Sequence, residues 1–151
     1  MGLACSHDAF HGAYTAFNTL RQAVCHAMGG SWPPHIKRDE KFNLVRDENG
    51  EIIWLREIND FSFSIADEFE DKEKYAGLWA FLTHSDCDGE ISPEMCKRVA
   101  DELEKFILPK LRHYGEAPGH IGYQGGYAKV LKKFIKGCRK AHHAGQPLEF
   151  Y

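Results

Sequence analysis

The sequence predicts an α+β fold, in which residues 1–151 form a single, mainly helical domain with about four helices and one β-hairpin. Apolar residues recur every three or four positions in four separate segments, which is the period of a helix face. An Asn-Gly pair between two β-branched and aromatic runs indicates the hairpin. A chain of 151 residues buries roughly 70% of its extended-chain surface, which is enough for one core without disulfides or metals.

The first helix is predicted at residues 8–28. Asp8 can cap its first turn, and Gly29-Gly30 ends it. The apolar residues of this segment share one helix face: Phe10, Tyr14, Phe17, Leu20, Val24 and Met28. Residues 31–34, Ser-Trp-Pro-Pro, cannot continue a helix and predict an extended connection.

The hairpin is predicted from two runs, residues 41–46 and 51–56, which are joined through Asn49-Gly50. Asn-Gly supplies the positive φ angles of a tight hairpin turn. Because an isolated hairpin is only marginally stable in water, Ile52, Trp54 or their neighbours are expected to pack on the helices.

Two further helices are predicted at residues 71–83 and 93–111. The start of the second is marked by Ser92, whose hydroxyl can accept a bond from an unpaired backbone N–H, and by Pro93, which loses no hydrogen bond at the first helical position. The expected buried stripe of this helix consists of Met95, Val99, Leu103, Phe106 and Ile107.

The last helix is predicted at residues 126–142, with its lysines turned outward, and the apolar tail 148–151 is expected to dock. The formal net charge of −3 indicates no general attraction to nucleic acid, so nucleic acid is not an expected partner. Residues 39–73 and 86–104 are rich in acids. One face is nevertheless expected to be basic, through Lys129, Lys132, Lys133, Lys136, Arg139 and Lys140.

The cysteines and the hydropathy bear on the cellular compartment. Five cysteines are an odd number and no secretory segment precedes them, which predicts reduced thiols in a cytoplasm. No apolar run approaches the roughly 20 residues of a membrane-spanning helix. Residues 1–6 match the short N-myristoylation pattern, but the residues that follow are predicted to be structured rather than a flexible leash, so acylation is not expected.

An acidic junction between two predicted helices contains His84, Asp86, Cys87 and Asp88. It fits the middle of a calcium-binding loop, but its ends offer an imidazole and a thioether where oxygen ligands are required. The alternative is a sharp turn in which Gly89 adopts a positive φ and the aspartates accept backbone N–H bonds.

A second polar cluster, Cys5-Ser6-His7-Asp8 followed by His11, repeats the same side-chain types. Its Ser, His and Asp are adjacent in sequence and point in different directions, which argues against a hydrolase triad. The His-x-x-Cys spacing of the acidic junction resembles half of a zinc site, which this cluster could complete. That alternative metal set is Cys5, His7, His84 and Cys87, and otherwise no cofactor is expected.

The glycine-rich segment before the last helix is the third candidate site. Gly125, Gly126 and Lys129 could hold a phosphate, because bare N–H groups and the dipole at a helix start attract anions. Tyr123 and Tyr127 could stack on a base or ring. The alternative is a flexible connection whose tyrosines fill the core.

Residues 2–14, 84–91 and 132–139 resemble a family of small uncharacterised proteins encoded by phages and prophages. The resemblance touches both ends and the middle of the chain. It implies no established activity and no functional residues, but it implies a setting in the host bacterial cytoplasm during infection. Small phage proteins of this kind often interfere with a host system, either by binding a host protein or by sequestering a signalling molecule.

These observations predict a phage accessory protein that captures an anionic, nucleotide-like ligand without catalysis, with sequestration of a host defence signal as its role. The expected ligand-binding residues are His7, Asp8, His11, His84, Asp86, Asp88, Tyr123, Gly125, Gly126, Tyr127 and Lys129. Two alternatives remain open: a zinc-dependent hydrolase or deaminase, and a protein-binding inhibitor of a host enzyme. Membrane is not an expected partner, and the sequence leaves the oligomeric state open.

Overall fold

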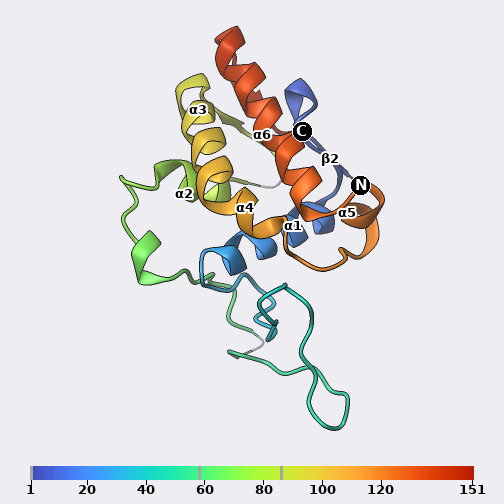
Figure 1. The fold of residues 1–151 in the computed structure, drawn as a ribbon. Coiled ribbons are helices and arrows are strands. Elements are labelled where there is room, and N and C mark those ends of the chain that lie inside the picture. Colours follow the sequence, from blue (N-terminus) through green and yellow to red (C-terminus); the bar gives the residue numbers. More distant parts are fainter. Residues whose placement is uncertain (1, 58, 86) are drawn as a thin grey trace.

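Helices α3 and α6 lie side by side, and α2 packs against α3 (Figure 1). The computed structural model describes residues 2–57, 59–85 and 87–151. Within these ranges, no helix has both the length and the apolar character needed to cross a membrane. The α-helices are α1 (Tyr14–Ala27), α2 (Ala76–Thr83), α3 (Pro93–Glu102), α4 (Leu108–Leu111), α5 (Gly119–Tyr123) and α6 (Tyr127–Ala144), with 3-10 turns at Ser6–Asp8 and Asp67–Phe69.

Two short antiparallel strand pairs complete the fold and confirm the predicted α+β class. In the first pair, β1 (Gly2–Ala4) lies beside β2 (His11–Ala13). In the second pair, β3 (Glu90–Ile91) lies beside β4 (Leu148–Glu149). The second pair joins the middle of the chain to its end, so the C-terminal tail docks as expected, with Leu148 and Phe150 buried.

The predicted first helix is six residues too long at its start, because α1 begins at Tyr14 rather than at residue 8. Residues 11–13 belong to β2, and Ala13 occupies the N-cap position without a side-chain bond. Asp8 therefore does not cap this helix. Hydrogen bonding between β1 and β2 outweighs the helical periodicity of the residues before Tyr14.

The predicted helix at 93–111 is present, but its helix type changes within it. Ser92 accepts a hydrogen bond from the Met95 N–H at 3.2 Å, which confirms the predicted cap. A π-helical turn at Leu103–Ile107 separates α3 from α4. Pro109 accounts for this turn, since a proline inside a regular α-helix clashes with the carbonyl four residues earlier.

The first turn of α2 is capped from the neighbouring helix. The buried carboxylate of Glu102 on α3 accepts hydrogen bonds from the N–H groups of Gly77 at 3.1 Å and Leu78 at 3.3 Å. Arg98 pairs with the same carboxylate at 3.2 Å. A Cβ at Gly77 would lie 2.4 Å from the Arg98 carbonyl oxygen, so only glycine permits this close approach of α2 to α3.

The predicted hairpin turn forms, but its flanks are not regular strands. Gly50 has a φ of 77°, as the turn requires. The flanking residues make only isolated bridges, Arg46 with Ile52 and Ile36 with Trp54 among them. This arm, residues 35–57 and 59–64, extends away from the helices (Figure 1), and the Trp54 side chain is 43% exposed. The contact with a helix is made instead by Phe42 of the first run, which is buried with its ring 5.2 Å from that of His26 on α1.

A cluster of buried aromatic rings joins the elements around Phe17 of α1. The Phe17 ring, which is fully buried, lies 5.1 Å from Phe10 and 5.7 Å from Phe81 of α2, measured between ring centroids. It lies 6.0 Å from Phe134 of α6 and 5.9 Å from Phe150 after β4. One side chain thus contacts both ends of the chain and two helices.

Replacing Phe17 with alanine is expected to lower the free energy of unfolding by about 3–5 kcal/mol, because it leaves a cavity where these four rings meet. Urea denaturation measures the change. Phe61→Ala is the matched control, because that ring is 83% exposed and should cost no more than about 0.5 kcal/mol. Equal losses in the two variants would contradict the central place of Phe17.

Candidate anion-binding groove

The outer face of α6 carries five lysines that line one groove. The groove encloses about 480 Å³. Its lysines are Lys129, Lys132, Lys133, Lys136 and Lys140, which recur at helical spacing. The other wall is formed by His7 and Asp8, with Gln124 beside the start of α6. The groove therefore joins the predicted amino-terminal cluster to the basic helix.

The turn that carries His7 and Asp8 has an unusual backbone. Their φ angles are 56° and 57°, in the left-handed region that non-glycine residues rarely occupy. The turn is held from several sides: the Ser6 hydroxyl accepts a bond from the Glu149 N–H at 2.8 Å, and the Ala9 N–H donates to the Ser6 carbonyl at 3.2 Å. These contacts keep both side chains at the groove.

Close contact with α6 fixes the position of this turn. A Cβ placed on Gly137 of α6 would lie 2.3 Å from the Ala9 Cβ and 2.6 Å from its Cα. Ala9 is fully buried and cannot move outward without opening the core. The absence of a side chain at Gly137 therefore lets the turn lie directly on the helix.

The charge of the groove is strongly unbalanced. Asp8 is the only carboxylate among the described residues that line it, and its Oδ1 lies 3.4 Å from the Lys133 Nζ. This pair is exposed, and exposed ion pairs contribute little to stability. The other four lysines of the lining form no ion pair with a carboxylate of the described residues, so the groove favours an anion.

The start of α6 lies at one end of this groove. Gly125 and Gly126 have φ angles of 104° and 102°, which glycine adopts without strain. A Cβ at Gly125 would lie 2.4 Å from the Lys129 Cδ, so the lysine stem lies across this glycine. The Gln124 side-chain amide donates to the His11 carbonyl at 2.7 Å, which ties the loop to β2.

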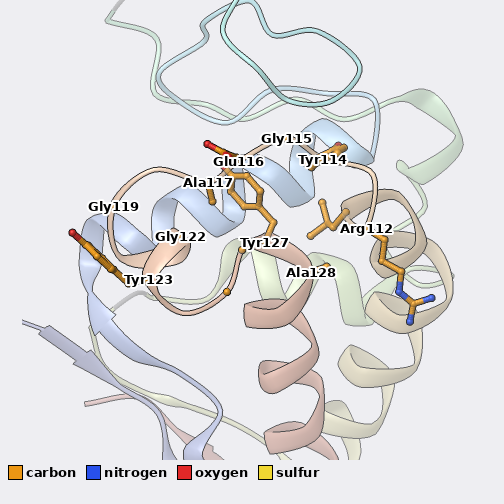
Figure 2. A pocket seen from close by; sticks show the side chains of 13 residues that line it. Arg112, Tyr114, Gly115, Glu116, Ala117, Gly119, Gly122, Tyr123, Tyr127 and Ala128 are labelled. Carbon is orange, nitrogen blue, oxygen red and sulfur yellow. The ribbon is translucent and has the colours of Figure 1, made fainter.

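The predicted phosphate and stacking residues divide between two cavities. Lys129 lines the lysine groove, whereas Tyr123, Gly125, Gly126 and Tyr127 line a neighbouring cavity of about 890 Å³ (Figure 2). Tyr123 is 91% exposed and points away from the other labelled side chains in Figure 2. It is therefore accessible to a ring of a ligand.

Tyr127 does not serve the predicted stacking role, because its ring belongs to the core. It is buried, with its centroid 5.3 Å from that of Phe42 and 6.2 Å from that of Tyr114. Burial raises the pKa of the Tyr127 hydroxyl. The sequence-based alternative, in which a tyrosine of this segment fills the core, applies to Tyr127.

The acidic junction lies outside both cavities. The His84 ring is held by its own loop, with Nδ1 2.7 Å from the Ser85 carbonyl oxygen and Nε2 3.2 Å from that of Glu90. The ring also packs on Phe150, with 4.2 Å between centroids. Cys87 and Asp88 are exposed nearby, and Asp86, which was predicted to bind the ligand, lies outside the described residues.

The C-terminal tail separates this junction from the amino-terminal cluster. Phe150 donates its N–H to the Gly89 carbonyl at 2.9 Å, and on the cluster side it forms a β-bridge with Cys5. The two polar clusters therefore flank the tail and do not form one composite pocket. His11 is exposed on β2 and is absent from the lining of either cavity.

The proposed zinc ligands are not assembled. Among residues 2–57, 59–85 and 87–151, no group of three or more His, Cys, Asp or Glu side chains is placed to hold a metal ion, so Cys5, His7, His84 and Cys87 do not form a site. Burial raises the pKa of the Cys5 thiol to about 12, which keeps it protonated. Both His84 nitrogens already face backbone carbonyl oxygens.

Comparisons of the chain with protein-family models, with curated proteins and with solved structures found no match. Known proteins therefore provide no activity that could be transferred to these residues. The charge and shape of the lysine groove are the features that indicate a ligand.

Sequence reasoning assigned Lys129 to the site but left out its neighbours. Four lysines that line the groove, Lys132, Lys133, Lys136 and Lys140, were interpreted only as part of a basic face, and Gln124 was not singled out. Their helical spacing was a usable signal, since residues three, four, seven and eleven positions apart share one side of a helix. The opposite wall could not be inferred from that spacing.

Gly137→Ala is expected to destabilise the protein by about 1–3 kcal/mol, because the new methyl group must displace the Ala9 backbone. Helix propensity alone predicts a gain of about 1 kcal/mol, so the sign of the change in urea denaturation is decisive. The double variant G137A/A9G should recover part of the loss. A stabilised single variant would contradict the tight contact between the turn and α6.

Thiol reactivity should follow burial. Cys87 is exposed and the other four cysteines are buried, and burial raises the pKa values of Cys5 and Cys25 to about 12. In a colorimetric thiol assay at pH 8, the native protein should therefore show one fast thiol, and the urea-unfolded protein should show all five. Cys87→Ser should remove the fast phase. Any fast thiol that remains in that variant would contradict the burial of the other four cysteines.

Proposed function

We propose that this protein binds a small anionic, nucleotide-like ligand in the lysine groove and does not turn it over. The observation that carries this proposal is the convergence of five lysines and a single carboxylate around a cavity of about 480 Å³. Cavities of roughly 300–1,000 Å³ are typical of small-molecule sites. Lysine ammonium groups are donors without acceptor capacity, which suits phosphate oxygens.

The residues around the start of α6 support a ligand that carries a phosphate next to a ring. The N-terminus of α6 adds about half a positive charge near Lys129. The exposed Tyr123 ring is at the end of α5, and Gln124 follows it in the connection to this helix. The Gln124 oxygen, which the bond to His11 leaves unused, can accept a hydrogen bond from a base.

The composition of the groove supports binding rather than catalysis. Its described lining contains no serine, threonine, cysteine or tyrosine that could act as a nucleophile. His7 is the only imidazole among the described residues of the lining. Among the described residues, no carboxylate is hydrogen-bonded to its ring to orient it as a general base.

The resemblance to phage-encoded proteins completes the proposal. In a bacterial cytoplasm during infection, a binder without turnover lowers the free concentration of its ligand. The proposed role is therefore sequestration of a phosphate-bearing host signal. Each bound molecule is removed only as long as it stays bound, so this role requires tight binding and a high protein concentration.

A second candidate function is inhibition of a host protein by direct contact. The observation that favours it is a group of exposed apolar side chains on the hairpin arm. Phe61 is 83% exposed, Leu55 55% and Trp54 43%. The arm is distinct from the lysine groove, since none of these residues lines the groove. Variants of the groove lysines therefore leave this surface unchanged and separate the two functions.

Isothermal titration calorimetry with nucleoside mono-, di- and triphosphates and inorganic triphosphate tests the proposed function. At least one of these anions is expected to bind, with an affinity that falls as salt is raised, because the attraction is mainly ionic. Lys136→Gln should weaken binding about tenfold, whereas Lys37→Gln, a matched change on the exposed arm, should leave it unchanged.

Asp8→Asn should change the affinity in the opposite direction. The Asp8 carboxylate competes with a bound anion for Lys133, so its neutral isostere should tighten binding several-fold. Absence of heat with every anion, together with an unchanged melting temperature at millimolar concentrations, would refute the proposed function.

A further inference from the structure

The lysine row is longer than one phosphate group requires. Lys129 and Lys140 are eleven residues apart on α6, which corresponds to about 16 Å along the helix axis. Lys132, Lys133 and Lys136 fill the interval at helical spacing. The positive charge therefore forms a line along the helix, and only its first turn benefits from the helix dipole.

We propose that the ligand is a short oligonucleotide, linear or cyclic, whose successive phosphodiester groups follow this row. This inference rests on the proposed function and names the class of ligand. A stacked strand carries one phosphate about every 3.4 Å along its axis, so the row matches roughly four or five phosphates of a stacked strand and fewer of an extended one. The phosphates of a single nucleotide are joined through single bridging oxygens and cannot follow the whole row.

The two ends of the row differ in what they can recognise. At the Lys129 end, the Tyr123 ring is 91% exposed, and aromatic rings at such positions stack on bases of any sequence. At the Lys140 end, the next polar ring, His142, is held by the Pro93 carbonyl at 2.9 Å. His143 is exposed three residues beyond Lys140 but does not line the groove, so the lysines dominate recognition at this end.

The limited length of the lysine row restricts the groove to a short ligand. The row ends at Lys140, and the groove is bounded opposite α6 by the turn that carries His7 and Asp8. Phosphates beyond the row meet no further lysine of the groove. Affinity should therefore rise with the number of phosphodiesters and then level off, which separates a short ligand from a long nucleic acid.

Calorimetry of the full chain with a homologous series tests this inference. The series contains adenosine monophosphate, linear adenylate dimers, tetramers and octamers, and cyclic dimers and trimers. The tetramer is expected to bind at least about tenfold more tightly than the mononucleotide at low salt, and its salt slope should steepen by about 0.7 for each further phosphate engaged. The octamer should gain no more than about threefold over the tetramer, beyond the statistical increase in sites.

Lys140→Gln supplies the matched variant, because it removes charge from the far end of the row. It should weaken the tetramer about three- to tenfold, which is more than it weakens the mononucleotide, whereas Lys37→Gln should affect neither. A preference for cyclic over linear forms, or the reverse, identifies the source of the ligand and supports the inference in both cases.

Two results would overturn the inference. Equal affinity for the mononucleotide and the tetramer would show that one phosphate site suffices, and the proposed function would stand without the oligonucleotide class. A steady rise from the tetramer to the octamer would indicate a long nucleic acid instead. If no member of the series and no simple anion binds, both the inference and the proposed function fail.

Discussion

The packing of four aromatic rings around Phe17 is the constraint on which the rest of the structure depends. These rings come from the turn before β2, from α2, from α6 and from the residue after β4, so one buried side chain holds segments that are far apart in sequence. Phe150 is in the cluster because the tail pairs with β3, and Phe10 is there because β1 and β2 turn back over the helices. The position of the amino-terminal turn on α6 follows from this packing.

The groove exists because that turn accepts a costly backbone conformation. Two successive non-glycine residues in the left-handed region cost of order 1–3 kcal/mol each and persist only where the surroundings determine them. Ser6, Ala9 and Gly137 provide those surroundings, through a hydrogen bond to Glu149 and a direct contact with the helix. The strain therefore lies in the wall of the groove, where His7 and Asp8 face the lysines.

Local charge, rather than net charge, determines what this protein attracts. The whole chain carries a formal charge of −3, yet five lysines line one groove with one carboxylate. Electrostatic interactions between exposed groups extend over about 8–10 Å at physiological salt, so acids on the distant arm do not cancel the field in the groove. An anionic ligand relieves the mutual repulsion of the lysines, which makes binding most favourable at low salt.

The sequence by itself determined the features that depend on near neighbours: the periodic helices, the cap by Ser92, the turn at Asn49-Gly50 and the basic face of the last helix. Only the tertiary structure decided which residues share a site. It placed Tyr127 in the core, divided the two polar clusters by the tail, left Cys5 buried without a metal cluster among the described residues, and set Asp8 beside Lys133. The physical reason is that periodicity and capping act within a few residues, whereas the groove results from contacts between segments more than 120 residues apart.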